Sequence, residues 1–206
     1  MSDVDIEQKV LLPYLSFMRP NNGGITLSGG DPLVQPGFAA AIFRRARLLG
    51  LTTALDTAVS GSPVSWDVVL PHTTHVLLCP KIFDDDAYKH LVGVDGGPVL
   101  RRFVSHLVGS YPEIRVTVRW VLLNGLTDTQ EQLERLAAFC RSLRTCFDEV
   151  ELLPYHDFGR HKYDALGWRY PMEGTPPYVR ADAETFARQL EEIGVACVLG
   201  DALGTS

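Results

Sequence analysis

The chain has 206 residues and a formal net charge of −6, with 46% hydrophobic and 21% charged residues. These proportions are typical of a globular protein with a core large enough to fold without disulfides or a structural metal. The acidic balance argues against nucleic acid or an anionic membrane as the main partner. No apolar run reaches the roughly 18–20 residues of a membrane span, and the polar start "MSDVDIEQKV" has no features of a signal peptide. We therefore expect a cytoplasmic protein.

Six apolar runs rich in β-branched residues alternate with amphipathic stretches. Strands are predicted at 24–28, 52–57, 74–79, 114–122, 149–154 and 195–199, and helices at 35–49, 63–71, 84–91, 97–109, 128–144 and 182–193. The fifth helix has Asp128 as a candidate N-cap, followed by Glu and Gln in its first turn. This alternation predicts an α/β fold with a parallel sheet, as an open doubly wound sheet or an incomplete barrel. Residues 156–181 lack clean periodicity and are expected to form a long functional loop.

The four cysteines are Cys79, Cys140, Cys146 and Cys197. Their spacing fits neither a disulfide framework nor a metal cluster. Cys140 and Cys146 are interpreted as residues in or near a helix, and Cys197 as a residue of a core strand. Cys79 differs from them because it ends a predicted strand.

Polar groups follow nearly every predicted strand. They are Ser28-Gly29-Gly30-Asp31, Asp56-Thr57, Cys79-Pro80-Lys81, Arg119 with Asn124-Gly125, and Tyr155-His156-Asp157. Ligands of parallel α/β folds bind at the carboxyl ends of the strands, so this set predicts a binding site there. The glycine pair permits close backbone approach or a positive φ. Acidic and basic groups at one edge suit the two charged ends of an amino-acid-like ligand.

Five segments carry a resemblance to a known family: "GGITLSGGDPLVQPGF", "LDTAVSG", "YKHLVGV", "VRWVLLNGLTDT" and "VELLPYHDFGRHKYDALGWRYPMEGTPP". In order, from about residue 4 to 199, they resemble the pyruvate formate-lyase activating enzymes, which are glycyl-radical activases of the radical S-adenosylmethionine (SAM) superfamily. The resemblance implies a partial (β/α) barrel of about six parallel strands, formed by residues 1–206 as a single incomplete domain. It also implies that SAM binds across the carboxyl ends of the strands.

The resemblance further implies roles for individual residues. Gly29, Gly30 and Asp31 match the segment at the methionyl amino group, and Asp56 and Thr57 match positions near the SAM carboxylate and a monovalent cation. Lys81 and Arg119 match basic positions in the SAM region, and His156 matches a histidine of the SAM pocket. Residues 157–178 match the region where the partner protein would be handled.

Two departures from the family pattern concern metals. No CxxxCxxC motif, the ligand set of the family's [4Fe–4S] cluster, occurs in the sequence. In the family this loop and the first barrel strand precede the segment that matches residues 4–18, so we expect both to be missing and no cluster to be bound. Cys79 also stands where the family has an acid, two residues before Lys81. Because hard cations prefer oxygen ligands, we expect no metal site there.

Three functional hypotheses follow. The first is a cluster-free enzyme, a lyase or transferase, that binds SAM as substrate. It would transfer the methyl or aminocarboxypropyl group, or release methylthioadenosine with ring closure of the aminobutyrate unit. Cys79, Lys81 and His156 are its candidate catalytic residues, and the basic neighbour would favour a Cys79 thiolate, although a purely structural cysteine stays open.

The other two hypotheses do not require catalysis by this chain alone. One is a non-catalytic subunit that completes its barrel through a homodimer or another protein at the unpaired strand edge. The other is a truncated fragment of a glycyl-radical-enzyme activase.

Overall fold

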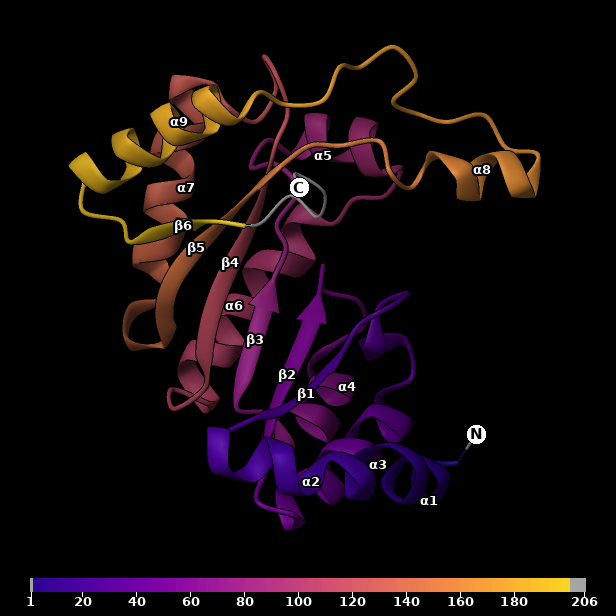
Figure 1. Ribbon diagram of the computed structural model, residues 1–206. Helices are drawn as coiled ribbons and strands as arrows, with labels where there is room; N and C mark the ends of the chain where they lie inside the picture. The colour runs from indigo at the N-terminus through magenta and orange to yellow at the C-terminus, as the bar shows by residue number, and fades with distance from the viewer. Residues whose placement is uncertain (1, 201–206) are drawn as a thin grey trace.

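The computed structural model describes residues 2–200 and contains one parallel sheet of six strands (Figure 1). The strands are β1 (Gly24–Leu27), β2 (Thr52–Thr57), β3 (His75–Leu78), β4 (Arg115–Leu122), β5 (Phe147–Pro154) and β6 (Cys197–Leu199). Their order in the sheet is their order in the chain. A doubly wound sheet reverses its strand order at a switch point, and no such reversal occurs here. The partial barrel is therefore confirmed, with β1 and β6 at the two edges.

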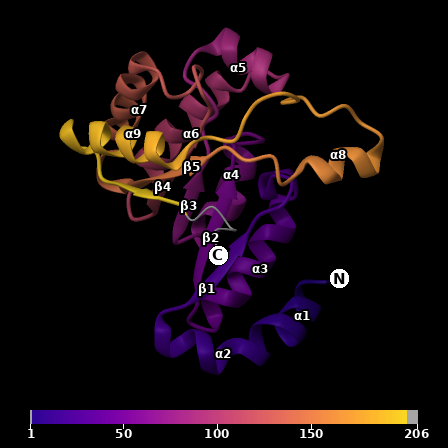
Figure 2. The same ribbon diagram turned by 45° about the horizontal axis from the view of Figure 1, so that its top comes forward.

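Helices follow the strands and cover one face of the sheet. Helices α3 (Pro36–Leu48), α4 (Pro63–Val69), α6 (Gly97–Ser110) and α7 (Gln130–Ser142) lie behind the sheet in Figure 1, and α9 (Arg180–Glu192) packs against β5 and β6. Helix α5 (Asp85–Val92) lies beyond the carboxyl end of β3. Helix α8 (Arg160–Leu166) is carried away from the sheet on a long arm, as Figure 2 shows from above. No helix within residues 2–200 is long and apolar enough to cross a membrane.

The N-terminal segment is helical, which the sequence did not predict. It runs through α1 (Asp3–Ile6), a π-helical stretch at Glu7–Leu11, α2 (Leu12–Met18) and a 3₁₀ turn at Arg19–Asn21. Further 3₁₀ turns follow at Pro32–Val34, Leu70–His72 and Arg144–Cys146. Arg45 of α3 holds the segment through ion pairs with Asp3, at 2.6 Å, and with Glu7.

The expected N-cap of α7 is corrected by one residue. Thr129, in extended conformation, caps the helix, and its side chain accepts a hydrogen bond from the Gln132 amide at 3.3 Å. Asp128 instead accepts from the Gly125 amide at 2.7 Å and from the Tyr178 hydroxyl at 3.0 Å. Asp128 thereby ties the turn after β4 to the segment that precedes α9.

Two hydrophobic cores hold the fold together. The main core lies between the sheet and its helices and includes Trp66, Phe103 and Trp120, all fully buried. A second, small cluster forms under the N-terminal helices from Leu11, Ala46 and Leu51. Since the helices cover only one face of the sheet, the other face is left for polar side chains.

Candidate active site

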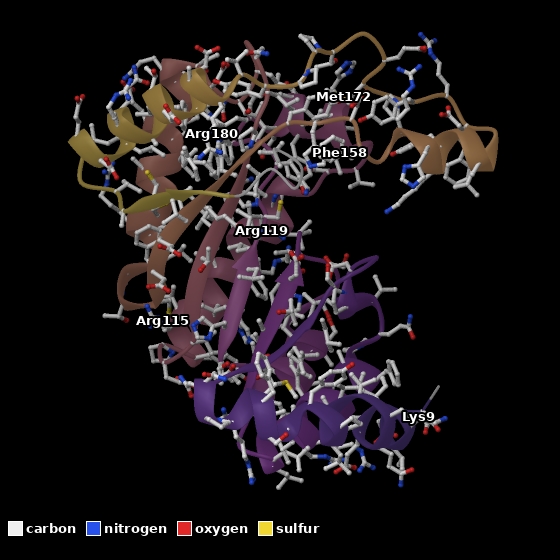
Figure 3. All side chains as sticks on the ribbon, viewed as in Figure 1. Lys9, Arg115, Arg119, Phe158, Met172 and Arg180 are labelled. Carbon is white, nitrogen blue, oxygen red and sulfur yellow. The ribbon has the colours of Figure 1, made fainter. Side chains whose placement is uncertain are left out.

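Five side chains, in or directly after five adjacent strands, form a row on the uncovered face, here called the inner-face row: Ser28, Asp56, Cys79, Arg119 and Glu151. Alternate residues of a strand point to the same face. In β2, Leu55 and Thr57 are buried on the helix side, so Asp56 between them points to the other side. The register pairs Leu27 with Leu55, which aligns Ser28 with Asp56. It pairs Leu77 with Thr117 and Arg119 with Glu151, which aligns Cys79, Arg119 and Glu151. Asp56 itself lies opposite Leu77, so the row steps by two residues between β2 and β3, and Arg119 bonds to Asp56 across that step. Figure 3 shows Arg119 near the middle of this face.

Three hydrogen bonds connect most of the inner-face row. The Ser28 hydroxyl donates to Asp56 Oδ2 at 3.0 Å, and Arg119 Nη1 donates to the same oxygen at 3.0 Å. Arg119 Nε donates to Glu151 Oε2 at 2.7 Å. Burial opposes the charge of Arg119, but the hydrogen bond and charge of Glu151, with Asp56, raise its pKa above the ordinary value. One guanidinium is thus shared by two carboxylates, and this triplet carries a net charge of −1.

Lys81 lies beside the row and contacts the half-buried Cys79. Its Nζ donates to Cys79 Sγ at 3.1 Å. Within residues 2–200 no carboxylate lies in ion-pair distance of Lys81. The end of β3 therefore offers a thiol and an ammonium group whose charge has no acidic partner in the described protein.

Asp31 and Thr57 connect the loops after β1 and β2. The Asp31 carboxylate accepts from the Leu33 amide at 3.0 Å, from the Ala58 amide at 3.2 Å, and from the Thr57 hydroxyl at 2.8 and 2.9 Å to its two oxygens. Thr57 is only 2% exposed. The oxygens of both side chains therefore accept hydrogen bonds from groups of the protein itself. The two acidic side chains of the inner-face row are Asp56 and Glu151.

The backbone after β1 has the open geometry that the glycine pair suggested. Gly29 adopts φ +117°, a conformation that strains any residue with a Cβ. A Cβ built at Gly29 or Gly30 would meet no atom within 4 Å. A cavity of about 330 Å³ adjoins this turn, with Ser28, Gly30 and Asp31 on one side and Phe38 of α3 on the other. The backbone of this turn is therefore accessible to a ligand.

The loop after β2 contains a strained position. Val59 has φ +70°, which is rare for a β-branched residue, and its amide is held by Thr57 Oγ1 at 2.9 Å. Such strain collects at functional sites, where surrounding contacts fix the backbone.

His156 is exposed, and its contacts are with Phe158. Its Nδ1 accepts from the Phe158 amide at 3.3 Å, and its ring lies 4.2 Å from the Phe158 ring. The neutral imidazole then carries its proton on Nε2, so Nε2 is a hydrogen-bond donor. The structure brings Cys79 and Lys81 together, whereas His156 makes no hydrogen bond to either among residues 2–200.

Sequence reasoning placed Ser28 at the site but missed Glu151 and Tyr88. Glu151 could be recognised only once the register of β4 and β5 was known, because the register places Glu151 directly beside Arg119. Tyr88 of α5 is 3% exposed, belongs to neither hydrophobic cluster and forms no side-chain hydrogen bond among the described residues. Burial raises its pKa, and the charges of Cys79 and Asp31 raise it further.

The other three cysteines do not converge on this site. Cys140 lies buried in α7, where burial raises its pKa to about 12, and Cys146 lies in the turn that follows. Cys197 is on β6, and burial raises its pKa to about 11. An iron–sulfur cluster needs several thiolates at one place. No group of three or more metal-ligating side chains occurs within residues 2–200, so these cysteines do not fit a [4Fe–4S] cluster.

Known proteins similar to this chain are activating enzymes. The chain is 32% identical over 190 residues to the pyruvate formate-lyase 1-activating enzyme of Escherichia coli K12, an alignment that covers 90% of this chain and 75% of that protein. It is 33% identical over 183 residues to the pyruvate formate-lyase-activating enzyme of Staphylococcus epidermidis, covering 85% of this chain and 71% of the relative. No family model matches the chain.

Solved structures share the fold. A domain of a pyruvate formate-lyase-activating enzyme from Bacteroides vulgatus aligns with TM-score 0.69 and 21% identity, over 87% of this chain and 99% of that one. SuiB of Streptococcus suis, in a crystal structure with bound SAM, aligns with TM-score 0.62 and 14% identity over 97% of this chain and 41% of that one. These structures establish the architecture, and the sequence identities establish the relationship: the chain belongs to the pyruvate formate-lyase activating enzyme family of radical SAM proteins.

Proposed function

We propose that this protein binds SAM on the inner-face row and converts it by polar chemistry without an iron–sulfur cluster, as a lyase or transferase. The observation that carries the proposal is the charge arrangement at the strand ends. Lys81 has no acidic partner among residues 2–200, and beside it the Asp56–Arg119–Glu151 triplet carries an excess negative charge. The family relationship and the SAM-bound structural neighbour support the choice of ligand.

The charges of SAM match this arrangement. SAM carries a carboxylate, an ammonium and a sulfonium group. Its carboxylate pairs with Lys81, while the two cationic groups lie toward Asp56 and Glu151. The backbone at Gly29 and Gly30 gives the methionyl part close access.

The expected chemistry uses the residues of this chain for positioning. When the SAM carboxylate oxygen attacks the γ-carbon, a C–O bond forms and the carbon–sulfur bond breaks. The electron pair stays on sulfur, so neutral methylthioadenosine leaves without an oxidant or a proton acceptor. In an alkyl transfer, the Cys79 thiolate forms a bond to a carbon attached to the sulfonium, and the bond from that carbon to the sulfonium sulfur breaks. Its electron pair stays on that sulfur, which leaves as a neutral thioether, and the Lys81 ammonium at 3.1 Å stabilises the attacking thiolate beforehand. His156 Nε2–H serves as a donor to the ligand.

The test is a calorimetric titration of the metal-free protein with SAM, followed by mass analysis of the products. Lys81→Met should weaken SAM binding about tenfold, because a charge-assisted hydrogen bond is worth roughly 1.5 kcal/mol or more. Lys89→Met, at an exposed position on α5, is the matched control. Methylthioadenosine or S-adenosylhomocysteine would support the proposal, and no heat at millimolar SAM would overturn it. Full turnover by Cys79→Ala would restrict Cys79 to a structural role.

A second candidate function rests on the edge of the sheet. Within the described residues β1 pairs only with β2, and Val34 and Phe38 expose apolar surface beside the cavity at this edge. A strand from a second copy or from another protein would pair there. Under this proposal the protein is a non-catalytic subunit, or part of an activase that acts on a glycyl-radical enzyme. A stable dimer with no SAM turnover would support the subunit, and 5′-deoxyadenosine after iron–sulfur reconstitution would support the activase.

We further propose that residues 1–206 act as one barrel-type domain in the cytoplasm. Limited proteolysis that releases two stable fragments would contradict the single domain.

A further inference from the structure

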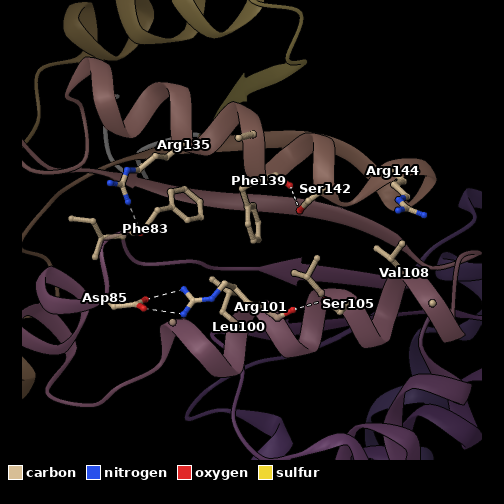
Figure 4. A pocket seen from close by; sticks show the side chains of 15 residues that line it. Phe83, Asp85, Leu100, Arg101, Ser105, Val108, Arg135, Phe139, Ser142 and Arg144 are labelled. Atoms are coloured by element: carbon tan, nitrogen blue, oxygen red, sulfur yellow. Dashed lines mark hydrogen bonds and ion pairs between the residues drawn. The ribbon is translucent and has the colours of Figure 1, made fainter.

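A groove of about 750 Å³ lies between α6 and α7, on the helical side of the sheet and away from the inner-face row. Figure 4 shows its two walls, with Leu100, Arg101, Ser105 and Val108 on α6 and Arg135, Phe139 and Ser142 on α7. Small residues create the space, since Gly97, Gly109 and Ala138 also line it. This volume lies within the roughly 300–1,000 Å³ that is typical of sites for small organic ligands.

The floor of the groove is apolar and firmly held. The Phe83 ring stacks on the buried Trp120 ring at 5.0 Å and 8°, and lies 5.0 Å from the Phe139 ring. The Phe83 amide donates to Gln132 Oε1 at 3.3 Å, and its carbonyl accepts from Arg135 Nη1 at 2.9 Å. Ile82, Leu100 and Val104 continue the floor. Since the aromatic rings are fixed by stacking, the groove is preformed.

The rim of the groove is positively charged, although the whole chain has a net charge of −6. Three arginines line it against a single acid, Asp85. Arg101 forms two hydrogen bonds of 2.9 Å to Asp85, and Arg135 pairs with Glu131 at 2.7 Å. Arg144 has no ion pair or side-chain hydrogen bond within residues 2–200. The groove therefore combines an apolar floor with one uncompensated guanidinium group.

We propose that this groove binds an amphipathic anion, a carboxylate that carries a long alkyl or aryl tail. The tail lies on the floor formed by Phe83, Val104 and Phe139, and the carboxylate pairs with Arg144. A partner helix is less suited to the site, because stable protein interfaces bury well over 1,000 Å² and this groove has the dimensions of a small ligand. The inference is independent of SAM binding, since its residues lie on the other side of the sheet.

The experiment uses dodecanoate as the probe, in displacement of 8-anilinonaphthalene-1-sulfonate followed by fluorescence. Dodecanoate should displace the dye with micromolar affinity, and dodecyltrimethylammonium, which has the same tail and the opposite charge, at least tenfold more weakly. Arg144→Gln should weaken dodecanoate binding five- to tenfold. Arg102→Gln, an exposed arginine on α6 outside the groove, should leave binding unchanged. Ala138→Trp, which fills the groove, should abolish binding while circular dichroism shows an intact fold.

Three results would each overturn the inference. They are no displacement by millimolar dodecanoate, equal affinity for the anionic and cationic amphiphiles, and unchanged binding in both Arg144→Gln and a folded Ala138→Trp. The dye alone serves as an internal check on folding, because a loosened variant would show higher dye fluorescence that dodecanoate does not displace.

Discussion

Replacement of Asp31 by Asn tests whether this acid holds the loops or faces a ligand. The carboxylate accepts from two backbone amides, of Leu33 and Ala58, and from the Thr57 hydroxyl. An amide side chain has only one acceptor oxygen, and its NH₂ group would face one of these donors. The variant therefore keeps the shape of the side chain and loses part of its bonding.

The magnitude follows from the bonds that are lost. At least one charge-assisted hydrogen bond disappears, worth about 1.5–3 kcal/mol, and a donor is left without an acceptor. Water partly compensates, because Asp31 is half-exposed. We expect a loss of about 2–3 kcal/mol in the free energy of unfolding. At about 2–4 °C per kcal/mol for a chain of this size, the Tm falls by roughly 5–10 °C.

Urea unfolding followed by circular dichroism measures this loss, and SAM titration of the same variant separates stability from binding. Asp95→Asn is the control, because Asp95 is exposed, lies outside the proposed site, and its side chain forms no hydrogen bond within residues 2–200. If Asp31→Asn unfolds within 0.5 kcal/mol of the wild type and yet binds SAM more weakly, the assignment of Asp31 to the loops is wrong.

Three further predictions concern the inner-face row, the Tyr88 pocket and alkaline pH. Arg119→Met leaves Asp56 and Glu151 without their cation and should lower the free energy of unfolding in urea by about 1–2 kcal/mol. The control Arg115→Met removes an exposed ion pair with Asp148 and should lower it by less than about 0.5 kcal/mol. Gly96→Ala places a Cβ 2.4 Å from Tyr88 Cε1 and should cost about 1–3 kcal/mol in thermal unfolding; no relief in the Gly96→Ala, Tyr88→Ala double variant would contradict the clash. Burial raises the pKa of the Cys140 thiol from 9.0 to about 12, so the thiol loses its proton at lower pH in the unfolded state than in the folded state. Its contribution to the free energy of unfolding is therefore fully present below pH about 9 and is lost as the pH rises toward 12. At pH 10 this thiol alone removes about 1.4 kcal/mol, and a urea titration in which Cys140→Ala keeps the full alkaline slope would refute the assignment.

The sheet was predictable from sequence because its strands are short, apolar and separated by amphipathic helices. The strand order was not, since the alternation fits both a doubly wound sheet and a barrel, and the choice came from the family resemblance. The N-terminal helices were missed because Pro13 and the π-helical stretch at Glu7–Leu11 interrupt the regular period of 3.6 residues.

For the candidate site, the sequence predicted which polar residues lie at the strand ends, but it did not predict which side chains form hydrogen bonds with one another. The contact between Cys79 and Lys81 follows from their spacing along one strand end. The bonds of Asp31 to the loop after β2, and of Arg119 to Glu151, join residues more than 25 positions apart. Such contacts depend on register and loop conformation, which no local pattern encodes. The groove between α6 and α7 was not foreseen for the same reason, because its walls come from two separate helices.

The division of the apolar interior into two cores has a consequence for local unfolding. The N-terminal helices rest on only three fully buried residues, Leu11, Ala46 and Leu51, whereas β4 lies in the main core. Segments with few buried contacts open with a smaller free energy than the whole molecule. Amide hydrogens of residues 3–18 should therefore exchange with solvent by an opening that leaves the sheet intact. The segment next to the free edge of β1 would then be the part of the molecule that rearranges first when a partner binds there.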